Sequence, residues 1–443
     1  PRTRERAAAV IPRASLVWLF AGVAGVALVV AVIGSPGTVW VAVLGAVIGF
    51  AGLDALLAAR TTVPAIERKL PASMSLMNWV DVGLSVSNRG ERAVRLRMFD
   101  HHPQAFDVEG LPCDVAVRPQ HFADVVYRAR PTERGEFEFP GCELRIVSPY
   151  GLWWRRRFVD ASSIVRVYPN YSTISKLLAF EVDNKLQLTG VRMSRRRGEG
   201  LEFHQLRDYR EGDSLRAIDW KATARMSRPI TREYQDERDQ QIVFLLDTGR
   251  RMLAKDAELS HFDHALNAML LLSYVALRQG DGAGVMTAGP QRSWLPPRKG
   301  VGTINAILNH VYDINPQPVE VDYLTAATEL AVRQRRRALV VILTNVREED
   351  SESLFAATGL LRRRHLVILA SLREGALDDV LEHPVSSFDD ALRYAGANQY
   401  LAARRESQDL LRARGVFVED CLCEHLPAAI TSRYLAIKRA GML

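Results

Sequence analysis

The chain has 443 residues, which is too many for one hydrophobic core, so about three folded units are expected. Its hydrophobic and charged fractions, 48% and 25%, exclude a mainly disordered chain. The net charge of +7 permits contact with anionic lipid, nucleic acid or an acidic protein, but selects none of them. The four cysteines are too scattered to predict a disulfide framework or a zinc site with paired-ligand spacing: Cys113, Cys142, Cys421 and Cys423.

Two apolar runs follow a basic N-terminal tail, residues 1–13. Residues 14–33 carry no charge, and about 20 helical residues cross a hydrocarbon core of roughly 30 Å. Gly34-Ser35-Pro36-Gly37 breaks the helix, and the second run, residues 38–59, contains one charge, Asp54, which we expect to reach the lipid headgroups. A signal peptide is the alternative for the first run, but a second span follows directly. We therefore predict a transmembrane helical hairpin over residues 14–60.

Basic residues flank this hairpin on both sides, and the connecting turn has none. They are Arg2, Arg4, Arg6 and Arg13 before the first run, and Arg60, Arg68 and Lys69 after the second. Positively charged flanks remain in the cytoplasm. The expected topology is multi-pass in the cell membrane, with both termini and the soluble domains cytoplasmic.

Residues 61–175 show the two-residue period of β-strands. Hydrophobic residues alternate with polar ones over 80–87 and again over 94–98, and Asn88-Arg89-Gly90 forms a turn between them. This pattern predicts a hairpin with one buried face. Further strands are expected over residues 125–129, 136–139, 144–147 and 164–168. Short strands broken by Gly and Pro favour a small β-sandwich.

Residues 176–240 form a charged segment that also contains aromatic residues. Bulky rings stand beside charges of both signs, which indicates a docked segment rather than a linker. One interpretation is a partner-binding surface; the other, which we favour, is an internal salt-bridge network that fixes the segment against the next domain. The partner-binding candidates are Asp213, Arg216, Asp219, Trp220, Lys221 and Arg225.

Residues 241–443 alternate continuous apolar runs with helical patterns. Strands are expected over 242–246, 284–288, 339–343, 366–370 and 416–418, and helices over 262–277, 304–311, 324–333 and 354–363. This alternation predicts an α/β doubly wound domain with its ligand site at the carboxyl ends of the strands. Asp247 and Thr344-Asn345 lie at two such ends. The sequence contains no phosphate-binding loop and no nucleophile elbow.

The soluble part of the chain resembles a bacterial family, domain of unknown function 58, whose C-terminal half is similar to a von Willebrand factor type A domain. The matching stretches are RGEFEFPGCELRIVSPYGLWWRRR (134–157), LEFHQLRDYREGDSLRAIDWKATAR (201–225), FLLDTGRRM (244–252) and SRYLAIKRAGML (432–443). The most specific part is the Gly-Asp-x-x-Arg-x-Ile-Asp-Trp core that starts at Gly212.

The resemblance implies a position for a metal-ion-dependent adhesion site, in which oxygen ligands hold a hard cation. Asp247 matches the first Asp of that site, but Gly249 and Arg251 stand at its two Ser positions and Asn345 replaces its later Asp. Thr325 is the nearest match to its Thr. Because two hydroxyls and a carboxylate are lost and Arg251 repels a cation, we expect no metal and no cofactor here. Asp247 is expected to pair with Arg250 or Arg251 instead.

The resemblance also implies a function. Relatives are similar to proteins encoded beside AAA+ ATPases of the MoxR type, which predicts a non-enzymatic, membrane-anchored adaptor or scaffold working with such an ATPase in protein assembly or maturation. The lipid bilayer is the other expected partner. One alternative is a metal-assisted hydrolase that uses Asp247 with Asp213 or Asp219, but no nucleophile or metal set supports it. The other is nucleic-acid binding through the arginines, which is not expected because no recognisable module is present.

Overall fold

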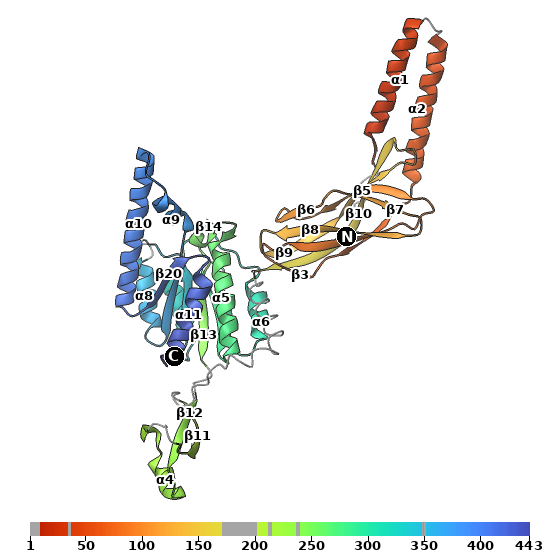
Figure 1. Ribbon diagram of the computed structural model, residues 1–443. Coiled ribbons are helices and arrows are strands. Elements are labelled where there is room, and N and C mark those ends of the chain that lie inside the picture. Colours follow the sequence, from red (N-terminus) through yellow and green to blue (C-terminus); the bar gives the residue numbers. More distant parts are fainter. Residues whose placement is uncertain are drawn as a thin grey trace. The chain divides into compact units, whose positions relative to one another are not determined.

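The computed structural model describes residues 9–33, 37–170, 202–210, 215–235, 240–347, 349 and 351–443. The chain divides into two compact units, Pro1–Tyr168 and Pro169–Leu443 (Figure 1). The first unit contains two apolar helices and a β-domain, and the second contains an α/β domain. The finer division into five segments remains a prediction.

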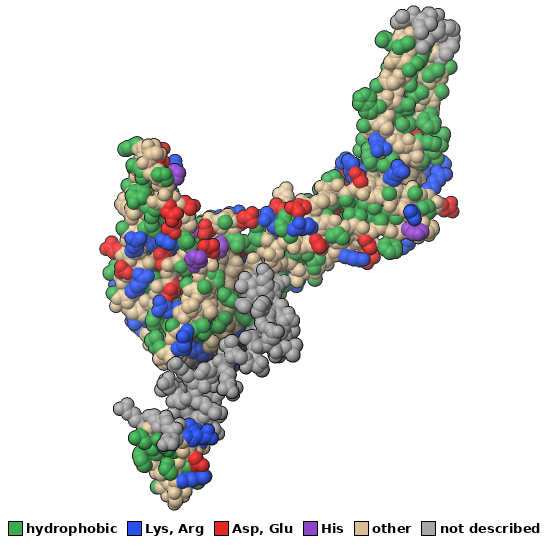
Figure 2. All heavy atoms as spheres, in the orientation of Figure 1, with side chains coloured by type: hydrophobic (Ala, Val, Ile, Leu, Met, Phe, Trp, Pro, Cys, Tyr) green, Lys and Arg blue, Asp and Glu red, His purple; other side chains and the backbone are tan. Residues whose placement is uncertain are grey.

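The N-terminal helices are α1 (Ala14–Ile33) and α2 (Gly37–Arg60). By length and composition, one described helix can cross a membrane, Trp40–Arg60 within α2, whereas Ala14–Val29 of α1 is a shorter apolar helix. Hydrophobic side chains are spread along the visible surface of both helices (Figure 2). Of the two predicted transmembrane spans, the one in α2 has the required length and composition in the described residues. The span in α1 remains a proposal.

The end of α2 is fastened to the β-domain through a buried carboxylate. Asp54 accepts hydrogen bonds from Ser148 Oγ at 2.6 Å and from the backbone amides of Tyr150 and Leu152 at 3.1 Å each. The indole Nε1 of Trp153 donates to the carbonyl of Ala51 at 2.8 Å. The expectation that Asp54 reaches the headgroups is thus wrong, because the turn at 148–152 supplies the donors that a buried carboxylate needs.

The β-domain consists of two sheets whose apolar faces form a common core. One sheet has the order β1 (Ala9–Pro12), β10 (Trp153–Tyr168), β9 (Gly135–Val147), β5 (Val94–His101), β7 (Cys113–Val117), and β3 (Ser73–Ser75) pairs with β10. The other has the order β2 (Ala65–Lys69), β4 (Val80–Ser87), β8 (Phe122–Pro131), β6 (Phe106–Glu109). The ring of Phe106 on β6 contacts those of Phe137 and Phe139 on β9, so the two sheets face each other. This arrangement agrees with the predicted sandwich.

The predicted hairpin of residues 80–98 is wrong in its pairing. β4 pairs with β2 and β8, whereas β5 pairs with β7 and β9 in the opposite sheet. Each strand has the predicted buried face, but the two faces cover each other across the sandwich instead of lying in one sheet. Asn88 holds the crossover, since its side-chain amide donates to the carbonyl of Arg92 at 2.8 Å. The strands expected at 136–139 and 144–147 are one continuous strand, β9.

A buried ion pair joins the two sheets. Arg68 on β2 donates through Nε to Asp100 Oδ2 on β5 at 3.0 Å, and both side chains are almost fully buried. The hydroxyl of Tyr127 on β8 donates to the same carboxylate at 2.7 Å. Burial lowers the pKa of Arg68, but its hydrogen bond to Asp100 and the charge of that carboxylate raise the pKa above its ordinary value. Arg68 is therefore a cation at neutral pH.

The α/β domain is built on a six-stranded sheet. Its order is β17 (Trp294–Arg298), β16 (Gly282–Ala288), β13 (Gln241–Asp247), β18 (Leu339–Thr344), β19 (Leu366–Arg373), β20 (Phe417–Leu422). All neighbours are parallel except β17, an antiparallel edge strand that the sequence patterns did not predict. The predicted doubly wound sheet is present.

Helices cover both faces of this sheet. One apolar core packs α5 (His261–Arg278), α6 (Thr303–Val311) and α11 (Leu426–Arg439) against Phe244 and its neighbours. The other packs α7 (Tyr323–Arg333), α8 (Ser351–Leu361) and the end of α10 (Phe388–Ala413) against Val243 and Leu245. A short helix, α9 (Gly375–Glu382), precedes α10. The patterns did not predict α9, α10 and α11.

We predict that Asp100→Ala destabilises the protein by about 3–5 kcal/mol, because it leaves the Arg68 cation buried without its partner. Tyr127→Phe removes one hydrogen bond to a charged group and should cost about 1.5–3 kcal/mol. Urea unfolding of the detergent-solubilised chain measures both changes. Asp114→Ala breaks the exposed pair with Arg97 and serves as the control, with little change expected. An equally small change in Asp100→Ala would contradict the role of the buried pair.

Candidate functional site

The candidate site lies at the carboxyl end of the α/β sheet, where the strand order reverses. Numbered along the chain, the six strands lie in the order 3-2-1-4-5-6. Ligands of such sheets bind beyond the carboxyl ends of the strands at the reversal, here between β13 and β18. Asp247 ends β13 and Thr344 ends β18, so the structure brings the two predicted strand ends together.

The carboxylate of Asp247 is buried and fully engaged. Its Oδ1 accepts from the amide of Gly249 at 2.7 Å, and its Oδ2 accepts from Tyr323 Oη and Thr344 Oγ1, both at 2.6 Å. Burial raises the pKa of Asp247, and the two hydroxyl donors partly oppose this shift. A cation at this carboxylate would have to displace these donors.

The expected ion pair between Asp247 and a neighbouring arginine is wrong. Arg250 pairs with Glu320 at 2.9 Å, and Arg251 pairs with Glu349 at 2.9 Å. Hydroxyls and a backbone amide take the place of an arginine because Asp247 is enclosed by α7 and the end of β18. The charge of Arg251 still helps to lower the pKa of Asp247.

The space beside Asp247 is too small for a ligand. The cavity there has a volume of about 10 Å³, close to that of a single water, and Val319, Val321 and Tyr323 contribute to its lining. The amide of Arg250 donates to the carbonyl of Val319 at 2.9 Å, which holds this segment over the loop. A Cβ added to Gly249 would lie 2.6 Å from Val321 Cγ2 and 2.9 Å from Val319 O. A serine therefore does not fit at this position without a shift of the segment.

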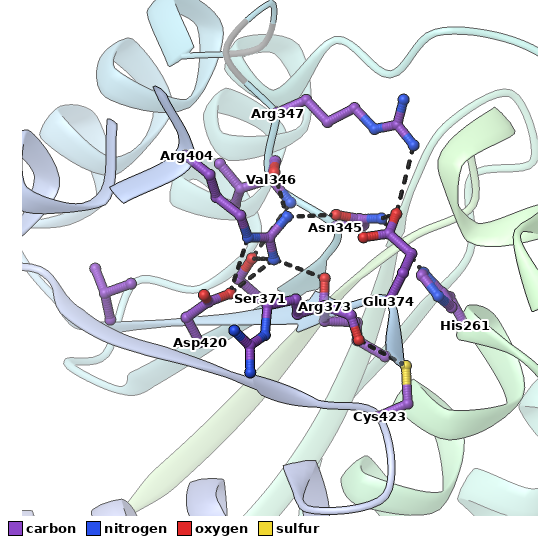
Figure 3. Close-up of polar contacts among 12 residues, drawn as sticks. His261, Asn345, Val346, Arg347, Ser371, Arg373, Glu374, Arg404, Asp420 and Cys423 are labelled. Atoms are coloured by element: carbon purple, nitrogen blue, oxygen red, sulfur yellow. Dashed lines mark hydrogen bonds and ion pairs between the residues drawn. The ribbon is translucent and has the colours of Figure 1, made fainter. Parts of the chain in front are cut away.

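Asn345 faces a second cluster, centred on Arg404 of α10 (Figure 3). Its Oδ1 accepts from Arg404 Nη1 at 2.8 Å, and its Nδ2 donates to Glu374 Oε1 at 2.6 Å. Arg404 also donates to Ser371 Oγ at 2.6 Å and to Asp420 Oδ1 at 2.7 Å. Asn345 thus fixes an internal cation, and the guanidinium of Arg404 links the ends of β18, β19 and β20.

Arg404 is 2% exposed and was missed by sequence reasoning. Burial lowers its pKa, but the hydrogen bond and charge of Asp420 raise the pKa above its ordinary value. A signal was present: Arg404 continues the helical spacing of residues that are all buried on α10, namely Ala397, Leu401, Gln408 and Leu411. An arginine on the core-facing side of a helix indicates a buried ionic partner. The sequence cannot show which carboxylate supplies it.

The hydrogen bonds of Thr325 are made to a residue outside the implied adhesion site. Its amide and hydroxyl both bond to Asp322, which caps the start of α7. The hydroxyl that reaches Asp247 from this helix belongs instead to Tyr323. Tyr323 was not predicted, because an aromatic at the start of an amphipathic helix has the pattern of a core residue.

The charged segment contains a β-hairpin and a short helix. Its elements are β11 (Glu202–Asp208), the 3₁₀ turn η1 (Leu215–Ala217), α4 (Trp220–Met226) and β12 (Ile230–Gln235). Asp219 is the N-cap of α4: its Oδ1 accepts from the amides of Lys221 and Ala222 at 3.0 Å each. Its Oδ2 accepts from Arg232 at 2.9 Å, which ties the helix to β12. Asp213 lies outside the described residues, and for Arg216 the backbone alone, in η1, is described.

The remaining candidates lie on an exposed surface of this segment. Trp220, Leu215 and Met226 are 71%, 70% and 60% exposed. Lys221 and Arg225, one helical turn apart on α4, are exposed as well. Large apolar side chains beside two cations have the composition of a protein-binding surface, with tryptophan and arginine enriched at its energetic centre. We call these five residues the α4 surface.

Comparison with known proteins finds a family model that matches part of this chain. Residues 205–387 match the family described as "Protein of unknown function DUF58". The match contains the α4 surface and Asp247, and it confirms the resemblance to domain of unknown function 58 over these residues. The resemblance to a von Willebrand type A domain remains a proposal.

The similar curated proteins have no assigned function. An uncharacterized Bacillus subtilis protein, YeaD, is 26% identical over 259 residues, which are 57% of this chain and 60% of that protein. An uncharacterized Mycobacterium tuberculosis protein is 25% identical over 182 residues, 40% of this chain and 57% of its own length. The chain therefore spans about 60% of the length of these relatives.

Similar solved structures share little with the chain. A CARDB domain from Pyrococcus furiosus has 15% identity and a TM-score of 0.16, and the match covers 24% of this chain and 97% of that domain. An aerotolerance-related membrane protein from Bacteroides fragilis has 17% identity and a TM-score of 0.23, and the match covers 30% and 67%. Scores this low support no assignment.

We predict that Asp247 does not bind a hard cation. Calorimetric titration of the purified chain with Mg²⁺ or Ca²⁺ should give no micromolar binding that Asp247→Ala abolishes, because both carboxylate oxygens are engaged. Gly249→Ser with Asn345→Asp restores two ligand types without creating binding. The serine should lower the unfolding free energy by about 1–3 kcal/mol through overpacking at Val321, and the aspartate should lower it further because it replaces the amide that donates to Glu374 with a carboxylate. Micromolar binding by the wild-type chain, lost in Asp247→Ala, would overturn this prediction.

Proposed function

We propose that this protein is a membrane-anchored, non-enzymatic adaptor that works with a MoxR-type AAA+ ATPase in the assembly or maturation of other proteins. The observation that carries the proposal is the α4 surface, which exposes a tryptophan inside the matched family segment while the adjacent aspartate serves to cap the helix. The engagement of Asp247 favours binding over catalysis, since a catalytic carboxylate needs access to substrate.

We further propose that the α/β domain is von Willebrand type A-like. Asp247 follows the first strand of its sheet and Asn345 follows the fourth, as the implied adhesion-site positions require. In this protein both positions bond to groups of the same domain: Tyr323 and Thr344 donate to Asp247, and Arg404 donates to Asn345. Such a domain would offer its carboxyl-end face as a surface and not as a metal centre.

Both N-terminal helices are proposed to span the membrane, with the soluble domains in the cytoplasm, where an AAA+ ATPase operates. Large apolar side chains are exposed along the two helices, including Trp18, Leu28 and Val41. Basic residues gather where the helices meet the β-domain: Arg13 lies over the ring of Trp154, and the guanidinium of Arg155 donates to the carbonyl of Thr61. This distribution follows the rule that positive charge remains inside.

The topology predicts opposite labelling of two introduced cysteines in intact cells. Ser35→Cys lies between the helices and should react with a membrane-impermeant maleimide. Gln104→Cys, an exposed position of the β-domain, should react after the cells are opened and not before. The unmodified chain controls for its own four thiols. Labelling of Gln104→Cys in intact cells would exclude a cytoplasmic partnership.

The α4 surface predicts a specific loss of partner binding. The purified chain in detergent should bind a MoxR-type ATPase from the same organism, and Trp220→Ala should weaken the affinity at least about tenfold, as expected for an exposed aromatic anchor. Its thermal unfolding should not change, because Trp220 makes little contact with the rest of the fold. Phe122→Ala, an equally exposed aromatic on the β-domain, is the matched control and should bind normally.

Asp219→Ala tests whether the α4 surface depends on its helix cap. It removes the cap of α4 and the pair with Arg232, so it should both destabilise the segment and weaken binding. Wild-type affinity in Trp220→Ala, or no interaction of the full chain with any such ATPase, would refute the proposed function.

A further inference from the structure

A group of metal-ligand side chains lies apart from Asp247, in the same α/β domain. Asp256, His264 and Cys423 place one ligand atom each within 4.8 Å of one another. Asp256 belongs to the short strand β14 (Lys255–Asp256), His264 to the first turns of α5, and Cys423 follows β20. More than 150 residues of chain separate the first and last of these positions.

We propose that Asp256, His264 and Cys423 form a zinc site. Thiolate, imidazole and carboxylate are all zinc ligands, and a soft sulfur disfavours Mg²⁺ and Ca²⁺. Bond lengths of about 2.0–2.3 Å place the ligand atoms of a tetrahedral zinc roughly 3.3–3.8 Å apart, so side-chain movements of about 1 Å complete the geometry. A thiolate, a carboxylate and a neutral imidazole also cancel the charge of Zn²⁺, which suits a position where Cys423 is buried and the other two residues are half-buried.

The surroundings supply an independent observation. His261 is fully buried and its Nε2 has no hydrogen-bond partner; the buried Oε2 of Glu374 also lacks one. His261 lies one turn before His264 on α5 and feels the charges of His264 and Asp256, while the charge of Glu374 acts on Cys423. Figure 3 shows His261, Glu374 and Cys423 on the same side of the Arg404 cluster. A bound water or ion is one of the arrangements that satisfy buried polar atoms of this kind.

A zinc-bound water accounts for these atoms. Three protein ligands leave the fourth zinc position for water, and such a water donates hydrogen bonds to acceptors around the metal. Glu374 Oε2 is an acceptor of this kind. His261 Nδ1 accepts from Asn345 Nδ2 at 3.4 Å, so the neutral ring carries its proton on Nε2 and can donate to the oxygen of the water. Gly375 packs closely on Asp256, since a Cβ at that position would lie 3.2 Å from Asp256 Oδ1.

The site would clamp the C-terminal part of the domain to its beginning. β14 directly follows the loop after β13, whereas Cys423 precedes α11, the last helix. A metal that joins positions so far apart in sequence removes much of the freedom of the unfolded chain, as a long-loop cross-link does. Loss of zinc should therefore loosen α11 and the carboxyl-end face.

Metal analysis of the purified full chain tests the site. After removal of metals with a chelator and reloading with Zn²⁺, mass spectrometry should find one zinc per chain. With Co²⁺ in its place, a thiolate-to-cobalt charge-transfer band should appear in the near ultraviolet. Cys423→Ser should abolish this band and, like His264→Gln, weaken zinc binding at least tenfold.

Two matched controls make the result specific. Cys421→Ser changes the half-buried thiol two residues away and should retain both the zinc and the band. Asp247→Ala should retain them as well, which separates this site from the strand-end carboxylate. If Cys423→Ser does not fold, the wild-type cobalt spectrum and His264→Gln still decide. Well under one zinc per chain, no thiolate band, or equal loss in Cys421→Ser would overturn the proposal.

Discussion

The burial of one cation, the guanidinium of Arg404, shapes the carboxyl-end face of the α/β domain. A buried charge persists only where ionic and hydrogen-bond partners surround it, so the ends of three strands must converge on it. Asp420 provides the counter-charge, and Asn345 and Ser371 provide oxygen acceptors. Asn345, which the family resemblance places at a metal-ligand position, is thereby committed to an internal contact. Arg404 from α10 therefore links the ends of β18, β19 and β20, as a bound metal ion can link strand ends in other proteins.

Asp247, like Asn345, is committed to contacts within the domain. A carboxylate at the strand-order reversal is normally exposed to a crevice, but here Tyr323 and Thr344 donate to it and the segment 319–321 covers it. Gly249 is required because any side chain would meet that segment. The carboxylate of Asp247 is thus satisfied by groups of its own domain, and the space left beside it is close in size to a single water.

Buried carboxylates also organise the first unit. Asp54 at the end of α2 accepts three hydrogen bonds from the turn 148–152, and Asp100 pairs with Arg68 between the two sheets. The first contact joins α2 to the β-domain. The second joins the two sheets of the sandwich. Neither carboxylate is a site for a ligand. A buried carboxylate is stable only where its hydrogen-bond donors or its cation are in place. Each of these two carboxylates therefore favours one arrangement of the elements that contact it.

Local periodicity in the sequence was sufficient to predict the apolar helices, the sandwich strands, the strand–helix alternation and the position of Asp247 at a strand end. These features depend on neighbours along the chain. Tertiary structure alone decided that β4 and β5 lie in opposite sheets, that α10 delivers Arg404, and that Asp256, His264 and Cys423 meet. The scattered positions of the cysteines do not predict a zinc site, because spacing patterns detect only ligands that lie close together in the sequence. Contacts between distant segments depend on how whole elements pack, and no local pattern encodes that.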